Sequence, residues 1–390
     1  MIRNACGYRQ LKVAEMALYH ALGHLLESQV THSFCGGGIF SPRPKGDISP
    51  PVQHRIPLAT YVVCAGWLHF TPMSQPIVVV TEGSDPVPLK WLREQAQVLE
   101  VGLNDPGLPA ALAQAEGLVI RTYTRVTSAF LAGCPKLRVI GRGGVGVENI
   151  DVRACRSRGV EVVYTPDANT LAVGDFVIGS MLQLLRPWCC FRESVYEPAE
   201  FKKIRETHRG RQLNELTLGV LGMGRVGRRL SHIAALGFGM KVIYHDLIDV
   251  AAQLEFPATS VDPDTLFRQA DVLSIHVDMR PGNENLVGGE QIAKMKADAI
   301  LINTSRGEVL DVQALAEALR AKRLFGAALD VYWPEPPKAG FPLLGLDNVL
   351  LSPHMAARTN TAMENMSWVV RDVVGVLRGE KPRYPVPAWR

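Results

Sequence analysis

The chain lacks the cysteine patterns that mark disulfide scaffolds and zinc sites. Its seven cysteines in 390 residues are odd in number and irregularly spaced, and no C-x-x-C pair occurs. It also lacks H-E-x-x-H and any other cluster of cysteine and histidine at metal-binding spacing. These absences argue against a small secreted fold and against a metal site. They favour a reduced intracellular compartment, and we expect a cytoplasmic protein.

Long apolar runs and an excess of one charge are missing as well. The longest apolar candidate, residues 61–70, is interrupted by Gly66 and His69 and is far shorter than the roughly 18 residues of a membrane span. The formal net charge is only +4, so electrostatics gives no reason to expect a nucleic acid or an anionic membrane as partner. With 47% hydrophobic and 21% charged residues, the composition is typical of a globular protein with two or three domains.

Residues 1–72 differ from the remainder of the chain. They contain three consecutive glycines at 36–38, many prolines and no sustained apolar period apart from a weak helical stretch at 11–26. A strong strand pattern begins only at Ile77. We therefore expect residues 1–72 to be an atypical, largely disordered extension or an over-extended translation, with a transit peptide as the alternative.

From residue 76 onward, apolar strands alternate with helical segments, which predicts parallel sheets with helices on both faces. The first group of predicted strands is 77–80, 98–101, 118–120, 139–141 and 160–164. A long helix is predicted at 171–186, after the capping candidates Asn169 and Thr170, and should lead from one domain into the next. A last helix is predicted at 361–378 and should pack back on the first domain.

The second group contains six predicted strands, at 218–221, 242–245, 272–275, 300–302, 327–329 and 349–351. The first runs into G-x-G-x-x-G at Gly222, Gly224 and Gly227, followed by a helical segment. Such glycines permit a sharp turn, close approach of a pyrophosphate and helix–strand packing, and the helix N-terminus attracts the anion. Asp246 ends the next strand, where an acceptor for a ribose 2′-hydroxyl is expected. The pattern predicts a dinucleotide site; the alternative is a structural glycine turn with a surface aspartate.

Three chargeable side chains, Arg306, Glu335 and His354, follow three successive strands of this group. Ligands of open parallel sheets bind beyond the carboxyl ends of the strands, so these side chains should meet at one rim. The planar fork of arginine matches a carboxylate, and a histidine held by a carboxylate can carry a proton near neutral pH. The set predicts hydride transfer between a nicotinamide and a 2-hydroxy or 2-oxo acid. Taken singly, each has a structural alternative: an ion-paired arginine, a solvated glutamate or a structural histidine.

With these motifs in view, the chain resembles the D-isomer-specific 2-hydroxyacid dehydrogenase family over roughly residues 77–385. This family includes phosphoglycerate dehydrogenase and glyoxylate/hydroxypyruvate reductase. The resemblance rests on the glycine fingerprint and on ordered motifs: G-R-G-G-V-G-V-E-N-I-D at 141–151, Thr165-Pro166 to Asn169-Thr170, residues 303–307, A-L-D-V at 328–331, Glu335-Pro336 and Pro353-His354.

The resemblance implies an α/β fold with two doubly wound parallel-sheet domains. A Rossmann NAD-binding domain, residues 171–354, would be inserted in a smaller flavodoxin-like substrate domain made of 76–170 plus 355–390. It also implies a small-molecule 2-hydroxy or 2-oxo acid as substrate. A homodimer is implied too, with residues 187–213 as a contact.

The resemblance also implies a role for individual residues. Arg306 would orient the substrate, His354 would be the acid/base and Glu335 would pair with it. Backbone amides of Gly143, Gly144 and Val145 would help to hold the substrate carboxylate. Arg121 and Arg142 point to an anionic substrate, with surface charge as the alternative. The cofactor NAD would be bound by Gly222, Gly224, Arg225, Val226, Gly227, Asp246, His276, Thr304, Ser305 and Asp330.

The chain departs from the family pattern at three places. Residues 355–358, M-A-A-R, replace the glycines that usually follow the histidine; Gly174-Asp175-Phe176 stands where an acid–histidine pair is common; and Val277-Asp278 replaces a usual proline. These departures leave the substrate and the loop shapes open, and a formate or phosphonate dehydrogenase remains an alternative. Because Leu247, not arginine, follows Asp246, we expect NAD rather than NADP. The alternative to an enzyme is a non-catalytic, corepressor-like protein that senses NAD(H).

Overall fold

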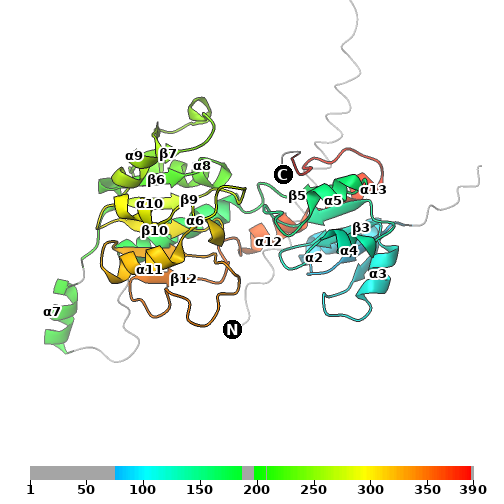
Figure 1. Ribbon diagram of the computed structural model, residues 1–390, viewed down its shortest axis with the longest axis horizontal. Coiled ribbons are helices and arrows are strands. Elements are labelled where there is room, and N and C mark those ends of the chain that lie inside the picture. Colours follow the sequence, from blue (N-terminus) through cyan, green and yellow to red (C-terminus); the bar gives the residue numbers. More distant parts are fainter. Residues whose placement is uncertain (1–74, 187–196, 208, 388–390) are drawn as a thin grey trace, which may run out of the picture. The chain divides into compact units, whose positions relative to one another are not determined.

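The computed structural model describes residues 75–186, 197–207 and 209–387, whose strands form two parallel sheets (Figure 1). The α/β class predicted from the alternating pattern is therefore confirmed. The predicted extension, residues 1–72, lies outside the described residues. No helix in the described ranges is long and apolar enough to cross a bilayer.

The first sheet has five strands in the order β2-β1-β3-β4-β5, which is the flavodoxin-like order. Each predicted strand is found to within one residue. The strands are β1 (Ile77–Val80), β2 (Gln97–Glu100), β3 (Gly117–Ile120), β4 (Val139–Arg142) and β5 (Glu161–Tyr164). Four helices connect them: α2 (Pro86–Gln95), α3 (Leu108–Gln114), α4 (Ser128–Ala132) and α5 (Val152–Ser157).

The predicted last helix is in fact two helices, α12 (Asn360–Ser367) and α13 (Val370–Leu377). The helix is interrupted at Trp368. The Trp368 ring packs edge-on against Trp91, with 6.1 Å between ring centroids, and lies under the Arg371 guanidinium. This break lets Val373 of α13 rest on the first sheet, where Gly117 leaves room for it. The C-terminal segment thus shares a core with β1, β3, β4 and β5, as predicted.

Helix α6 (Thr170–Leu185) follows β5 and packs against strands of the second sheet. Asn169 is its N-cap residue, but the Asn169 side chain makes no capping hydrogen bond. The buried hydroxyl of Thr170 has no partner among the described residues. The predicted helix is therefore present, whereas neither capping candidate caps it. Burial of one apolar face, including Val177, Met181 and Leu185, stabilises it instead.

The second sheet has seven strands in the order β12-β11-β10-β9-β6-β7-β8. The strands are β6 (Thr217–Leu221), β7 (Lys241–His245), β8 (Thr259–Ser260), β9 (Val272–Ile275), β10 (Ile300–Asn303), β11 (Gly326–Leu329) and β12 (Val349–Leu351). The prediction of six strands was wrong by one, because β8 has only two residues, both exposed, and shows no apolar pattern. The order reverses between β6 and β9, which is where open sheets of this kind bind nucleotides.

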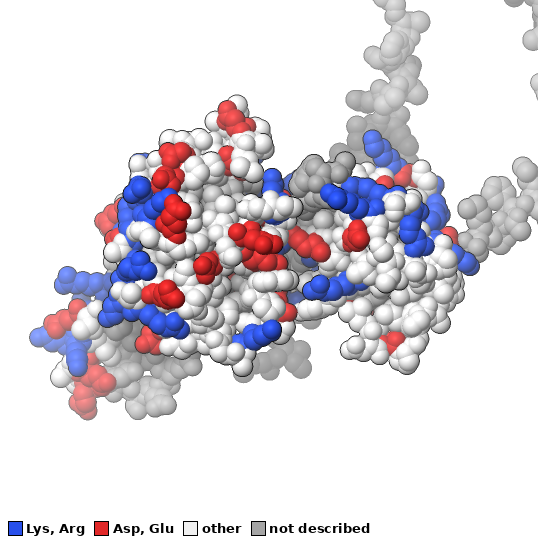
Figure 2. Space-filling model, in the orientation of Figure 1, with Lys and Arg blue, Asp and Glu red and all other residues white. Residues whose placement is uncertain are grey.

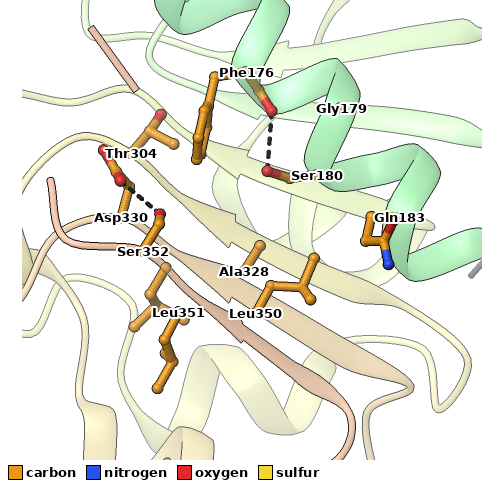
Figure 3. A pocket seen from close by; sticks show the side chains of 11 residues that line it. Phe176, Gly179, Ser180, Gln183, Thr304, Ala328, Asp330, Leu350, Leu351 and Ser352 are labelled. Carbon is orange, nitrogen blue, oxygen red and sulfur yellow. Dashed lines mark hydrogen bonds between the residues drawn. The ribbon is translucent and has the colours of Figure 1, made fainter. Parts of the chain in front are cut away.

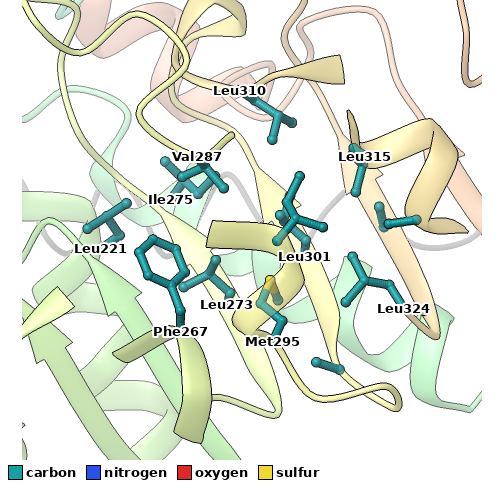
Figure 4. Close-up of a cluster of buried hydrophobic side chains, with 14 of the residues drawn as sticks. Leu221, Phe267, Leu273, Ile275, Val287, Met295, Leu301, Leu310, Leu315 and Leu324 are labelled. Carbon is teal, nitrogen blue, oxygen red and sulfur yellow. The ribbon is translucent and has the colours of Figure 1, made fainter. Parts of the chain in front are cut away.

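The described helices of this second part are α7 (Pro198–Thr207), α8 (Arg225–His232), α9 (Pro263–Gln269), α10 (Gly289–Lys294) and α11 (Val312–Arg320). Figure 4 shows the apolar cluster between α9, α10, α11 and one face of the sheet, with Phe267, Leu273 and Leu301 at its centre. Strands β9, β10 and β11 are buried along their whole length, which explains their continuous apolar sequences. A rigid core therefore lies directly beneath the strand ends that carry the candidate residues. On the face seen in Figure 2, basic and acidic side chains are interspersed over the surface.

Candidate active site

The glycine loop after β6 has the geometry of a dinucleotide site. Gly222 has φ +95°, and a side chain there would collide with the carbonyl of His276. Gly227 packs against the carbonyl of Gly222, so only glycine fits. Gly224 is the N-cap of α8, and a Cβ there would meet nothing within 4 Å. The first turn of α8 therefore offers backbone amides to open space, which suits a pyrophosphate.

Two other predicted cofactor residues lie at the start of α8. Arg225 forms an ion pair with Asp167, in the segment that precedes α6. Val226 is partly buried in the first turn of the helix. Arg225 is thus engaged in this structure, and a contact with the cofactor would come from its backbone amide or from exchange of the ion pair.

Asp246 lies at the end of β7 and is tied to the glycine loop. Its carboxylate accepts hydrogen bonds from the amides of Met223, at 2.7 Å, and Ile248, at 3.1 Å. These bonds fix the carboxylate beside the loop at the end of β7, which suits an acceptor of the adenosine ribose hydroxyls.

His276, at the end of β9, pairs through Nε2 with the hydroxyl of Ser274 at 2.8 Å. Burial lowers the pKa of His276 to about 4. The ring is therefore neutral at pH 7 and contributes no positive charge to a pyrophosphate. Its backbone carbonyl shapes the site by packing on Gly222.

Sequence reasoning missed an arginine near Asp246. Arg280 follows β9 and forms a two-pronged ion pair with Asp278, at 2.7 and 2.8 Å. The hydrogen bond with Asp278, together with the charges of Asp278 and Asp246, raises the pKa of Arg280 although partial burial lowers it. The absence of an arginine directly after Asp246 therefore does not mean that the ribose side is without one. Asp278, which stands where the family pattern has proline, holds this arginine.

The loop that carries His354 is built around Asp330 at the end of β11. The Asp330 carboxylate is almost fully buried and accepts from the hydroxyl of Ser352, at 2.6 Å, and from the amides of Met355 and Ala356, each at 2.8 Å. His354 has φ +49°, a conformation that a side chain disfavours, and its amide donates to the Asp330 carbonyl. Asp330, predicted to contact the nicotinamide carboxamide, thus also fixes the backbone of the histidine loop.

His354 and Glu335 are in direct contact, with Nδ1 of the histidine 2.8 Å from Oε2 of the glutamate. The second oxygen of Glu335 accepts from the amide of Tyr332 at 3.0 Å. Burial raises the pKa of the Glu335 carboxyl, but the interactions with His354, the Tyr332 amide and Arg306 together outweigh this effect, so the pKa lies below its ordinary value. An ionised carboxylate can only accept, so Nδ1 carries the proton and Nε2 is the ring nitrogen that Glu335 leaves unused. The His354 side chain is 46% exposed.

Arg306 follows β10 on a loop braced by Asn303. The Asn303 side chain accepts from the amide and hydroxyl of Ser305 and donates to the carbonyl of Arg306 at 2.8 Å. The next residue, Gly307, packs against the backbone of Tyr332 and Trp333, so this loop lies directly on the segment that leads to Glu335. The charge of Arg306 also contributes to lowering the pKa of Glu335. The structure therefore brings the three predicted catalytic side chains into one neighbourhood.

Beside them, a cavity of about 270 Å³ lies between α6 and the ends of β10, β11 and β12 (Figure 3). Phe176 and Ser180 of α6 face Thr304, Asp330 and Ser352 across it. The buried hydroxyl of Thr304 has no partner among the described residues, so it is available to a ligand. The hydroxyl of Ser305, in contrast, is used by Asn303. Of these two predicted cofactor residues, only Thr304 offers an unused polar group.

The Gly143–Val145 loop differs from what the resemblance implied. The amide of Gly143 donates to Ile120 and that of Gly144 to Arg142, each at 2.9 Å. Holding a carboxylate with these two amides would require the loop to rearrange. The Arg142 side chain lies across Gly144, and burial together with the charge of Arg306 lowers the pKa of Arg142 to about 10.

Arg121 is engaged with α12 in this structure. Its guanidinium donates to the hydroxyl of Ser367 at 2.7 Å and to the carbonyl of Met363 at 3.3 Å. These bonds attach the end of β3 to the C-terminal segment. A role of Arg121 in substrate binding stays a prediction. No group of three or more histidine, cysteine, aspartate or glutamate side chains in the described ranges could hold a metal ion.

Two doubly wound parallel sheets, an open glycine loop at the switch point and an acid–histidine pair at the strand ends define a nucleotide-dependent dehydrogenase class of fold. Comparison with known proteins supports this class. Residues 178–356 match the family model described as "D-isomer specific 2-hydroxyacid dehydrogenase, NAD binding domain". The open space at Gly224 and the Thr304 hydroxyl, which has no partner among the described residues, fit that cofactor.

Relatives extend the similarity beyond this domain. The chain is 38% identical over 282 residues to glyoxylate/hydroxypyruvate reductase B of Yersinia pestis, covering 71% of this chain and 85% of the relative. It is 37% identical over 311 residues to D-3-phosphoglycerate dehydrogenase of Methanocaldococcus jannaschii, covering 78% of this chain. The chain spans only 58% of that relative's length. The crystal structure of TT0316 protein from Thermus thermophilus matches with TM-score 0.71 and 33% identity, over 80% of this chain and all of that chain. The chain belongs to the D-isomer-specific 2-hydroxyacid dehydrogenase family.

Proposed function

We propose that this protein is an NAD-dependent oxidoreductase that transfers a hydride between nicotinamide and carbon 2 of a D-2-hydroxy or 2-oxo acid. The observation that carries the proposal is the 2.8 Å pair of Glu335 and His354, next to the loop of Arg306. Relatives named as glyoxylate/hydroxypyruvate reductase and phosphoglycerate dehydrogenase support it. The same names do not favour the alternative of a non-catalytic NAD(H) sensor.

In this proposal His354 is the acid/base. Glu335 holds the proton on Nδ1, so Nε2 gives a proton to the substrate oxygen during reduction and takes it back during oxidation. When bound, NADH would supply the hydride for reduction, and NAD⁺ would accept it in oxidation. Arg306 receives the substrate carboxylate and so fixes carbon 2 in position. Asp330 keeps the histidine loop in its strained conformation.

The glycine loop after β6 and the N-terminus of α8 would hold the pyrophosphate, and the Asp246 carboxylate would accept hydrogen bonds from the ribose hydroxyls. We expect NAD to be preferred over NADP, because the Asp246 carboxylate repels a 2′-phosphate and Arg280 is already paired with Asp278. A homodimer that uses residues 187–213, part of which lies outside the described residues, stays a prediction. A cytoplasmic location stays one as well.

A substrate panel tests the proposal. NADH oxidation is followed by absorbance with glyoxylate, hydroxypyruvate, pyruvate and phosphohydroxypyruvate, and with NADPH in parallel. Turnover of at least one 2-oxo acid with higher kcat/KM for NADH is expected. Binding of NADH without turnover of any 2-oxo acid would favour the sensor. Equal kcat/KM with both cofactors would contradict the NAD preference.

A further inference from the structure

Arg306 is held on two sides by acceptors of this chain. Its Nε and Nη2 donate to the two carboxylate oxygens of Glu148, at 3.0 and 3.2 Å, and its Nη1 donates to the carbonyl of Ser305 at 2.6 Å. An arginine has five N–H groups, and these bonds use three of them. The two that remain, one on each terminal nitrogen, have no partner among the described residues.

The Nη1–Nη2 end of the guanidinium fork is an edge that can receive both oxygens of a carboxylate. Glu148 occupies the side of the fork and not its end. The Arg306 side chain is 27% exposed, so a small anion can reach it. The arrangement is that of a clamp: two acceptors fix the plane of the guanidinium, and Glu148 leaves the Nη1–Nη2 end to another carboxylate.

The surroundings make the orientation of Arg306 depend on Glu148. The Arg142 guanidinium is close enough for its pKa to be lowered by the charge of Arg306 and raised by that of Glu148. Without Glu148, two like charges would face each other with no acid between them, and the flexible Arg306 side chain would move away. The pair also lies directly over Gly146, where a Cβ would collide with both Arg306 and Glu148.

We propose that Glu148 is a positioning residue that aims the open end of the Arg306 guanidinium at the carboxylate of the substrate. The inference deepens the proposed function and rests on it for the identity of the bound acid. A competing interpretation is that Glu148 occupies the place of the substrate carboxylate and must be displaced by it. The two interpretations predict opposite changes in carboxylate affinity when Glu148 is replaced. Removing a competitor strengthens carboxylate binding, whereas removing a positioning group weakens it.

The test compares Glu148→Gln and Glu148→Asp with the wild type. The matched control is Glu94→Gln, at an exposed glutamate of α2 without a described side-chain partner. Binding of oxalate, a small carboxylate resembling a 2-oxo acid, to the protein saturated with NADH is measured by calorimetry. Glu148→Gln should raise the oxalate Kd and the KM of the 2-oxo acid roughly tenfold, as expected for a misplaced binding group. Glu148→Asp, which keeps the charge, should restore part of the loss, and NADH affinity and Tm should match the control.

A second variant keeps both charges. Gly146 has no left-handed backbone angle, so Gly146→Ala should fold and displace only the Arg306–Glu148 pair, with the same rise in oxalate Kd. Unchanged or tighter oxalate binding in Glu148→Gln would overturn the inference, as would a wild-type protein that binds no oxalate. A wild type that binds oxalate in a Glu148-dependent way but reduces no 2-oxo acid would instead contradict the proposed function and leave the aiming role intact.

Discussion

Two glycine-rich loops follow parallel strands in this protein, and they use their glycines for opposite purposes. After β6, the loop from Gly222 to Gly227 exposes main chain: Gly224 faces open space at the start of α8. After β4, the loop from Gly143 to Gly146 is covered by side chains, because Arg142 lies across Gly144 and Arg306 lies over Gly146. At Gly224 the missing Cβ leaves open space, and at Gly144 and Gly146 it makes room for the protein's own guanidinium groups.

The difference teaches that a glycine run does not by itself identify an anion site. An open run next to a helix N-terminus can bind an anion with amides. A covered run whose amides are already bonded can act only through the charged side chains that it accommodates. The comparison of the two loops supports our proposal that the cofactor would bind at the loop after β6 and that Arg306, which lies over the loop after β4, would receive the substrate carboxylate.

The largest expected effect is on kcat and comes from His354, which lies in neither of the two glycine loops. His354→Ala should lower kcat by ~10²–10⁴, because the general acid/base is lost, and should leave the NADH Kd unchanged. Steady-state kinetics and fluorescence titration with NADH measure the two quantities. A variant with wild-type kcat would remove His354 from the chemistry, and a large loss of NADH affinity would show that the histidine loop belongs to the cofactor site.

The next effect concerns the fold of the cofactor loop. Gly227→Ala forces a Cβ against the Gly222 carbonyl, which is backbone and cannot move aside cheaply. We expect a loss of about 1–3 kcal/mol in the free energy of unfolding, the range of overpacked sites. Urea denaturation measures it, with Gly224→Ala as the matched control in the same loop. Equal stability of the two variants would mean that the close packing of Gly227 on Gly222 is not required.

Gly224→Ala itself sharpens the comparison between the loops. Its Cβ meets nothing in the protein, so no clash arises, and the loss of stability should be only about 0.5–1 kcal/mol because alanine is a poorer N-cap residue than glycine. If a pyrophosphate lies against this position, the NADH Kd should rise roughly tenfold, since about 1.4 kcal/mol of contact is lost. Gly146→Ala, in the other loop, should leave the NADH Kd unchanged. The reverse outcome, with Gly146→Ala weakening NADH and Gly224→Ala not, would exchange the roles of the two loops.

The parts of the fold that the sequence predicts well are those with local causes. Buried parallel strands must be apolar throughout, so β9, β10 and β11 are visible in the sequence. The glycine fingerprint is recognised by its spacing, although only Gly227 has its close contact nearby in the sequence, at the Gly222 carbonyl, whereas Gly222 packs on the distant carbonyl of His276. Strand β8, short and exposed, carries no such signal. The break at Trp368 is also invisible, since apolar residues continue on both sides of it.

The candidate site divides in the same way. The Glu335–His354 pair is 19 positions apart and follows from the rule that strand ends share one edge. The Glu148–Arg306 pair is 158 positions apart and joins residues that follow different sheets, so no spacing predicts it. The engagement of Arg121 by α12 is equally non-local, since it depends on how the C-terminal segment packs on the first sheet.

The smallest expected effect is on the free energy of unfolding, and it tests whether Glu82 holds residues 121–124 in place. Glu82, after β1, accepts from the amides of Arg121, Thr122, Tyr123 and Thr124 and from the Thr124 hydroxyl, at 2.6 to 3.1 Å. Burial raises the pKa of the Glu82 carboxyl, but these hydrogen bonds lower it more, so its pKa in the folded protein is below the ordinary value.

A depressed pKa stabilises the fold fully above the pKa of the unfolded chain, and the stabilisation is lost as pH falls through the folded value. Since the side chain is only half-buried, Glu82→Gln should cost about 1 kcal/mol at pH 7, and the difference from wild type should shrink below about pH 4.5. Urea denaturation across pH 3–7 measures this, with Glu94→Gln as control; a difference that is constant with pH would mean that the ionised carboxylate is not what holds residues 121–124 in place.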